Sequence, residues 1–172
     1  MKWLLLCAMA MFLLNLSSCT VYSDITMKEP LKLSLTKEMR ENHISPENSE
    51  LLGALQDIVE KNPGLGEIGK FSLLYSGING RSNGQYTTVF FAVNRTENTI
   101  KNIRFTLNVS VAGTYLMREY TVELDDEYYG DLAVNSAFPV VVYLNETQWD
   151  LLSHITNENL SITISEYSDE TV

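Results

Sequence analysis

The stretch Ile103-Arg104-Phe105-Thr106-Leu107-Asn108-Val109-Ser110-Val111 indicates the fold class of this chain more clearly than any other part of the sequence. Apolar side chains occupy every second position, and polar side chains lie between them. Successive side chains of a strand point to opposite faces of a sheet, so this pattern predicts a strand with one buried face. A period of two recurs from residue 70 onward, which indicates a mainly β domain.

Further strands are expected on either side of this stretch. Residues 79–84 are turn-rich and would close a hairpin. Pro139 lacks an N–H donor, so we expect it at a sheet edge or near the start of its strand. Short strands joined by tight turns favour an antiparallel, Ig-like β-sandwich. The expected strands comprise residues 71–75, 86–94, 103–111, 115–124, 137–144 and 160–166, with a short extended segment at 31–35.

One amphipathic helix is expected before these strands. Ser45 can serve as its N-cap, with Pro46 at the first helical position. The run Asn62-Pro63-Gly64 would end the helix. The apolar positions at helical spacing are Leu51, Leu52, Leu55, Ile58 and Val59. We expect this stripe to pack on the sheet, and we expect a second, short helix at residues 147–154 near the C-terminus.

The N-terminal segment has the layout of a secretory signal. Lys2 provides a positive start, and residues 3–14 are apolar, which is long enough for a signal core but too short for a permanent membrane span. The run Leu16-Ser17-Ser18-Cys19 follows and resembles the lipobox of bacterial lipoproteins. This resemblance implies cleavage between Ser18 and Cys19 and attachment of a diacylglycerol to the Cys19 thiol. An ordinary signal peptide cut elsewhere and a transmembrane anchor are the alternatives.

The lipobox predicts an extracytoplasmic protein anchored by lipid, in the cell membrane of a Gram-positive host or the outer membrane of a Gram-negative one. Two or more acyl chains hold a protein stably on a membrane. Cys7 would leave with the signal, so no disulfide within the mature chain is expected. The expected organisation is a signal peptide (1–18), a lipidated tether (19–30), a strand and helix (31–69), a β-sandwich (70–167) and an acidic tail (168–172).

The charge of the chain excludes some partners. The sequence has 22 acidic and 12 basic residues, a net charge of −10, and every acidic residue follows Cys19. Nucleic-acid binding requires a basic stripe, so a nucleic-acid partner is not expected. The same acidity opposes electrostatic adhesion to anionic lipid, which leaves the acyl chains as the expected contact with the membrane.

Part of the chain is similar to a known family of surface modules. The matching features are Asn94-Arg95-Thr96 after an apolar strand, Ile100 before an alternating strand, Ala112-Gly113 in a hairpin, and Asn135-Ser136 with Phe138-Pro139 at the start of a strand. Over residues 70–146 these features resemble the SLAP domain, a small β-domain of surface and lipid-anchored proteins of Gram-positive bacteria. The resemblance implies a non-catalytic surface module and supplies no active-site residues.

No pattern in the sequence indicates catalysis or a cofactor. It contains no nucleophile elbow of the type G-x-S-x-G, and neither His43 nor His154 has partners at zinc-ligand spacing. We therefore expect neither an enzyme nor a cofactor nor a metal site. The acidic residues between Asp125 and Asp131 favour a solvated hairpin, with weak calcium binding as the alternative, because their spacing is not that of a calcium loop.

Two classes of function follow from these observations. The favoured one is a non-catalytic interaction or structural module of the cell envelope, bound to an envelope protein or a wall polymer. Tyr128 and Tyr129 are the candidate partner contact, because they lie in a segment too polar for a core. Alternatively, both rings close the edge of the sandwich. The second class is a small-molecule or glycan-binding lipoprotein, or an enzyme, that uses a cleft between helix and sheet.

Overall fold

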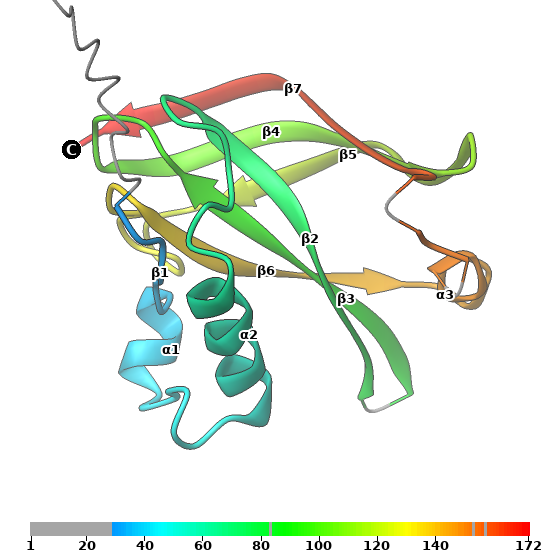
Figure 1. Ribbon diagram of the computed structural model, residues 1–172, viewed down its shortest axis with the longest axis horizontal. Helices are drawn as coiled ribbons and strands as arrows, with labels where there is room; N and C mark the ends of the chain where they lie inside the picture. Colours follow the sequence, from blue (N-terminus) through cyan, green and yellow to red (C-terminus); the bar gives the residue numbers. More distant parts are fainter. Residues whose placement is uncertain (1–28, 83, 153, 157) are drawn as a thin grey trace, which may run out of the picture.

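Two antiparallel β-sheets stacked face to face form the centre of the protein (Figure 1). The computed structural model describes residues 29–172, except residues 83, 153 and 157. The first sheet has the strand order β1-β6-β3-β2, in which only β1 runs parallel to its neighbour. The second has the order β5-β4-β7. The strands are β1 (Lys32–Leu33), β2 (Phe71–Ser82), β3 (Gln85–Asn94), β4 (Ile100–Val111), β5 (Thr114–Leu124), β6 (Ser136–Leu144) and β7 (Leu160–Thr171).

The main hydrophobic core lies between the two sheets. Strand β4 contributes its alternating apolar side chains, and the polar ones between them face outward, as the sequence predicts. From the first sheet, Phe90 and Phe138 reach the same core and are fully buried. Each such phenylalanine stabilises the fold by about 1.5–3 kcal/mol through burial. The prediction of a mainly β, sandwich-like fold is therefore confirmed.

Helices cover the other face of the first sheet. Leu52, Leu55 and Val59 of α2 form a second core with residues on β3 and β6, among them Phe91 and Ala137. The molecule thus has three layers, with helices, the first sheet and the second sheet in that order (Figure 1). Strand β3 is buried on both faces, which explains its continuous apolar sequence. The helices of this layer are α1 (Lys37–Glu41) and α2 (Glu50–Lys61), whereas α3 (Glu146–Leu152) packs on the main core beside β5.

Several element boundaries differ from the expected ones. Helix α2 starts at Glu50 with Ser49 as its N-cap, because the Ser49 hydroxyl accepts a hydrogen bond from Leu52 N; Ser45 N instead donates to Asn48 Oδ1. The expected loop at residues 79–84 is largely strand, because β2 resumes pairing with β3 after a bulge between Tyr75 and Asn79.

Two segments adopt regular structure that the sequence did not indicate. Helix α1 precedes α2, and its five residues are too few to show a helical period. Strand β7 continues to Thr171, so residues expected in the acidic tail pair with the start of β4, as Thr171 does with Ile100.

The position of Pro139 follows from the short length of β1. Lys32 and Leu33 pair with Ser136 and Ala137, and β1 then ends. From Pro139 onward β6 has only β3 beside it, so the missing N–H lies at an edge that needs no donor. This uncovered part of β6 is where the candidate functional site begins.

Arg95 fixes the start of the described chain to the first sheet. Its buried guanidinium donates to the carbonyl oxygens of Leu65, Pro63 and Glu29 and to Asn135 Oδ1. Its burial lowers the pKa of Arg95 below its usual value. A guanidinium has five donors in a rigid fork, so one side chain joins segments that lie far apart in the sequence.

Candidate functional site

The two tyrosines of the candidate contact lie in a tight turn between β5 and β6. The carbonyl oxygen of Asp125 accepts hydrogen bonds from Tyr128 N at 3.2 Å and Tyr129 N at 2.8 Å. Asp126 O accepts from Gly130 N at 3.1 Å in the same way. These bonds form a single helix-like turn, so the acidic segment holds its two tyrosines in defined positions.

Helix α1 is hydrogen-bonded directly to this turn. Lys37 N donates to Tyr129 O and Glu38 N donates to Tyr128 O, each at 2.9 Å. The first N–H groups of a helix have no partner within it, and here the turn satisfies two of them. Thr36 caps the helix by accepting from Met39 N at 3.2 Å. Helix α1 and the turn therefore form one rigid unit.

Gly130 allows the turn and helix to approach each other. Its φ of +73° lies in the left-handed region, which is costly for residues with a Cβ atom. A Cβ at this position would lie 3.0 Å from Arg40 Nη2 and 3.4 Å from Lys37 Cβ. Both the conformation and the contact therefore favour glycine.

The two tyrosine rings have different surroundings. Tyr129 is half-buried and packs on Phe138 of the main core, with 5.9 Å between ring centroids. Burial is the main reason that the pKa of Tyr129 is raised, and the nearby groups of Glu38, Tyr120 and Asp125 raise it further. The side chain of Tyr128 is 56% exposed. The structure thus places Tyr129 in the sandwich edge and Tyr128 at the surface.

Tyr128 forms one wall of a groove of about 320 Å³, which we call the tyrosine groove. Strand β6 supplies Val141 and Tyr143, and Tyr143 is 65% exposed. Helix α1 supplies the opposite wall, so the groove lies between a helix and the uncovered part of a strand. The residues that line it are Thr36, Glu38, Met39, Tyr128, Tyr129, Pro139, Val141 and Tyr143.

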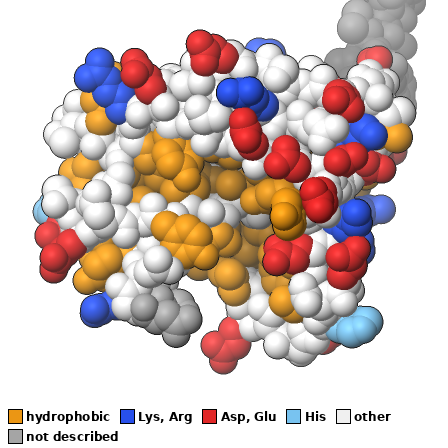
Figure 2. All heavy atoms as spheres, turned by 180° about the vertical axis from the view of Figure 1, so that it is seen from behind, with side chains coloured by type: hydrophobic (Ala, Val, Ile, Leu, Met, Phe, Trp, Pro, Cys, Tyr) orange, Lys and Arg blue, Asp and Glu red, His pale blue; other side chains and the backbone are white. Residues whose placement is uncertain are grey.

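Acidic side chains predominate around this groove. Figure 2 shows hydrophobic side chains gathered near the middle of one face, with many acidic side chains to one side of them. Lys37 and Arg40 of α1 are the basic residues of the turn–helix unit, and Asp126 is paired with Lys101 at 3.6 Å. The acidic residues of the unit are Glu38, Glu41, Asp125, Asp126, Glu127 and Asp131. Glu38 lines the groove itself, and this excess of acidic side chains in the turn–helix unit favours a basic partner.

The described residues form no recognisable metal centre. No group of three or more His, Cys, Asp or Glu side chains among them is arranged to hold a metal ion. His43 and His154 lie in two separate turns, one after α1 and the other after α3. Backbone hydrogen bonds from Tyr128 N, Tyr129 N and Gly130 N order the acidic turn.

The expected lipid-attachment site lies outside the described residues. This applies to both Ser18 and Cys19, so cleavage and lipidation at these positions stay predictions. Within residues 29–172, none of the helices is both long and apolar enough to cross a membrane.

The sequence pointed to Tyr128 and Tyr129 but not to the other residues of the groove. Val141 and Tyr143 lie in a continuous apolar run, which hides the alternation that would have marked them as outward-facing. Met39 belongs to the short helix α1, whose position could not be predicted from periodicity.

Comparisons with family models, curated proteins and solved structures find no match for this chain.

Proposed function

We propose that this chain is an extracytoplasmic lipoprotein, anchored through Cys19, that acts as a non-catalytic interaction module of the cell envelope. The signal-like N-terminus and its lipobox support the anchor. The tyrosine groove is the observation that carries the interaction function, because exposed aromatic residues at the centre of a surface supply most of the energy of a protein contact. Its rigid backbone means that little conformational entropy is lost on binding.

The partner that fits this groove best is an envelope protein with a basic segment. Its lysines or arginines would face the acidic rim, and an apolar side chain beside them would fill the space between Met39, Tyr128 and Tyr143. Opposite charges across an interface mainly accelerate association and select the partner. Binding should therefore weaken as salt is added.

The same proposal includes an Ig-like topology and a SLAP-like module. In chain order, β2-β3-β6 correspond to strands A-B-E of an Ig-like sandwich, and β5-β4-β7 correspond to C′-C-F. Asn94-Arg95-Thr96, which contributed to the SLAP resemblance, lies at the end of β3, where Asn94 Oδ1 accepts from Thr96 N at 3.0 Å. This order and this turn support a surface module whose binding residues lie outside the sheets' shared core.

A small-molecule or glycan-binding function in the same groove is the second candidate. The groove lies between helix and sheet, and its volume of about 320 Å³ is at the lower end of ligand pockets, which span about 300–1,000 Å³. The hydroxyl groups of Tyr128 and Tyr143 and the carboxylate of Glu38 could orient such a ligand. This candidate predicts saturable binding of a small molecule without capture of a protein.

Photo-crosslinking in host membranes distinguishes the two functions. The full-length chain would carry a photoreactive residue at Val141, with Tyr128→Ser as the test variant. Tyr115→Ser is the matched control, because Tyr115 is 54% exposed but lies on the second sheet. We expect a salt-sensitive adduct with a basic envelope protein that is lost in Tyr128→Ser and kept in Tyr115→Ser. Equal adducts in both variants would contradict the proposed contact, and an adduct with a small molecule would favour the second candidate.

A further inference from the structure

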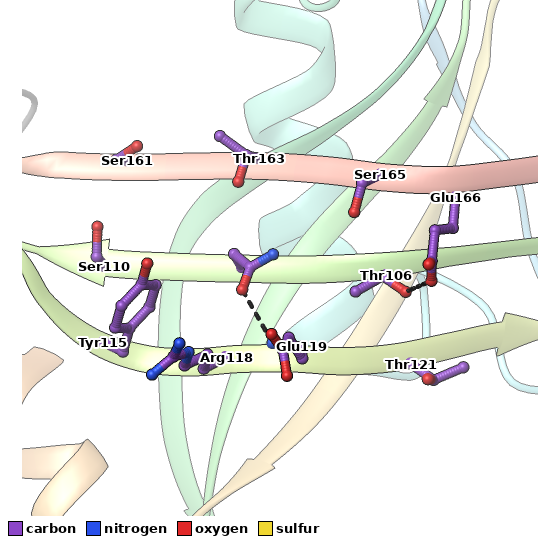
Figure 3. A pocket seen from close by; sticks show the side chains of 11 residues that line it. Thr106, Ser110, Tyr115, Arg118, Glu119, Thr121, Ser161, Thr163, Ser165 and Glu166 are labelled. Carbon is purple, nitrogen blue, oxygen red and sulfur yellow. Dashed lines mark hydrogen bonds between the residues drawn. The ribbon is translucent and has the colours of Figure 1, made fainter.

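A second hollow, distinct from the tyrosine groove, lies on the outer face of the β5-β4-β7 sheet. Its volume is about 700 Å³, and all three strands contribute side chains to it (Figure 3). Most of these side chains end in a hydroxyl group. The lining residues are Thr106, Asn108 and Ser110 of β4, Tyr115, Arg118, Glu119 and Thr121 of β5, and Ser161, Thr163, Ser165 and Glu166 of β7. We call this site the hydroxyl hollow.

The hydroxyl hollow results from an uneven distribution of side-chain lengths. Strand β4 and most of β7 carry short serine, threonine and asparagine side chains, which form the floor. Strand β5 carries Tyr115, Arg118 and Glu119, which form a wall along one side (Figure 3). The Arg118 guanidinium lies 5.3 Å from the centre of the Tyr115 ring, a cation–π contact that stabilises this wall.

Two glutamates flank the floor at irregularities in the outer strands of the sheet. Glu119 and Glu166 both have φ of +51°, an uncommon conformation for residues with a Cβ atom. Both lie where the strand register shifts, and such bulges re-aim side chains. Glu119 N donates to Asn108 Oδ1 at 2.9 Å, and Thr106 Oγ1 donates to Glu166 Oε2 at 2.7 Å. The two carboxylates thus border the hollow from opposite edges of the sheet.

The chemistry of this lining selects one class of ligand. It offers many donors and acceptors, two carboxylates, one guanidinium and one flat aromatic ring. Among the described residues that line it, only Tyr115 could bury apolar surface of a ligand, so a lipid or an apolar peptide would gain little. Two carboxylates against one cation also oppose a polyanion. A sugar chain without negative charge has the matching hydroxyl groups and one face that can stack on a ring.

We propose that the hydroxyl hollow is a binding site for a neutral or amino-substituted oligosaccharide. The short side chains of the floor form hydrogen bonds with the hydroxyl groups of the sugar, and Tyr115 stacks on a sugar ring. Glu119 and Glu166 accept hydrogen bonds from hydroxyl or amino groups of the ligand. This site goes beyond the proposed protein contact, since the tyrosine groove lies on the other sheet and beside α1.

Titration of the purified full-length chain tests this proposal. The probes are a tetramer of β-1,4-linked N-acetylglucosamine, its deacetylated form, and a sulfated oligosaccharide of similar length. We expect the first two to bind in the micromolar to millimolar range and the sulfated one not to bind, as measured by calorimetry. If neither the uncharged probe nor the amino probe binds at a concentration of about 10 mM, the proposal is overturned, because a dissociation constant above that value means very weak binding.

Matched variants locate the binding. Thr163→Lys places a long side chain on the floor, and Thr171→Lys makes the same change at an exposed position of the same strand outside the hollow. We expect Thr163→Lys to weaken binding at least about tenfold and Thr171→Lys to leave it unchanged. Tyr115→Ser provides a second test that leaves the floor intact, and it should also weaken binding. Unchanged affinity in both Thr163→Lys and Tyr115→Ser, or an equal loss in Tyr128→Ser, would contradict the assignment to the hollow.

Discussion

The two sheets share one core but differ in their outer faces. The first sheet is apolar on its outer face and is largely covered by α2, and only the part of β6 that lies beyond β1 leaves Val141 and Tyr143 exposed. The second sheet is polar on its outer face, and short side chains leave it hollowed. The two candidate sites therefore have different origins. The tyrosine groove lies on the part of the first sheet's outer face that the helices leave uncovered. The hydroxyl hollow lies on a solvated face of the second sheet, between strands that carry bulges.

Substitutions under α2 should have the largest effect on stability. Leu55 is fully buried between α2 and the first sheet, and Leu→Ala in such a core costs about 2–5 kcal/mol. Thr163→Ala on the outer face of the second sheet should change stability by less than about 0.5 kcal/mol. Denaturant unfolding measures both. Equal losses of unfolding free energy in the two variants would show that the residues between α2 and the first sheet do not form a core.

The two tyrosines of the turn should differ next. Tyr129→Ser removes a ring that packs on Phe138, and we expect a loss of about 2 kcal/mol, less than for a fully buried aromatic residue. Tyr128→Ser removes an exposed ring, so its effect should be within about 0.5 kcal/mol. Thermal unfolding of the two single variants provides the measurement. A comparable fall in melting temperature in both would mean that Tyr128 is structural and not available for contact.

Gly130→Ala tests the junction between the turn and α1. The left-handed conformation and the 3.0 Å approach to Arg40 should together cost about 1–2 kcal/mol. Gly113→Ala is the control, because its φ of +81° is similar but a Cβ there would meet no atom within 4 Å. The difference between their unfolding free energies reports the contact alone. Equal unfolding free energies of the two variants would indicate that Arg40 and Lys37 do not contact residue 130.

The alkaline limit of stability should depend on Tyr129. Its pKa is raised in the folded protein, mainly by burial, above the ordinary value of about 10. The folded chain therefore holds the phenolic proton more tightly than the unfolded chain, so this stabilisation is complete below about pH 10 and is lost as the pH rises through the folded pKa. Tyr129→Phe should lose less stability than the wild type between about pH 9 and 11. Parallel pH profiles for the two proteins would contradict this.

Cys19→Ser should leave both sheets unaffected. If lipid at Cys19 is the anchor, the variant moves from the membrane to the soluble fraction or accumulates unprocessed, while its unfolding curve is unchanged. Fractionation of cells after a high-salt wash provides the measurement. A variant that is still processed and membrane-bound would show that another segment holds the protein at the membrane.

The parts of the fold that could be predicted from sequence are those in which one residue pattern determines the environment. Alternation in β4 predicted one buried face correctly, and the continuous apolar run in β3 reflects burial on both faces, because burial acts directly on each side chain. Helix α1 and the extension of β7 could not be predicted in this way. Their stability comes from partners distant in sequence, such as the carbonyl groups of Tyr128 and Tyr129 for α1 and the start of β4 for β7.

The candidate sites show the same limit. Tyr128 could be recognised as an aromatic residue in an acidic segment, but the groove around it requires β1 to end at Leu33, which exposes part of β6. The hydroxyl hollow was missed because serine and threonine alternation is ordinary for a solvated strand. The bulges at Glu119 and Glu166 set this face apart from an ordinary solvated sheet, and their φ values depend on strand register rather than on local sequence.

The attachment of β1 has a mechanical consequence. Lys32 N and Ser34 N donate to the carbonyl oxygens of Asn135 and Ala137, and Arg95 Nη1 donates to Glu29 O nearby. A force that pulls residue 29 along the axis of β1 would load these bonds in shear, so they would have to break together rather than one after another. Tension carried by a tether would end at this junction. The groove and the hollow could then keep their shapes while the domain is under load.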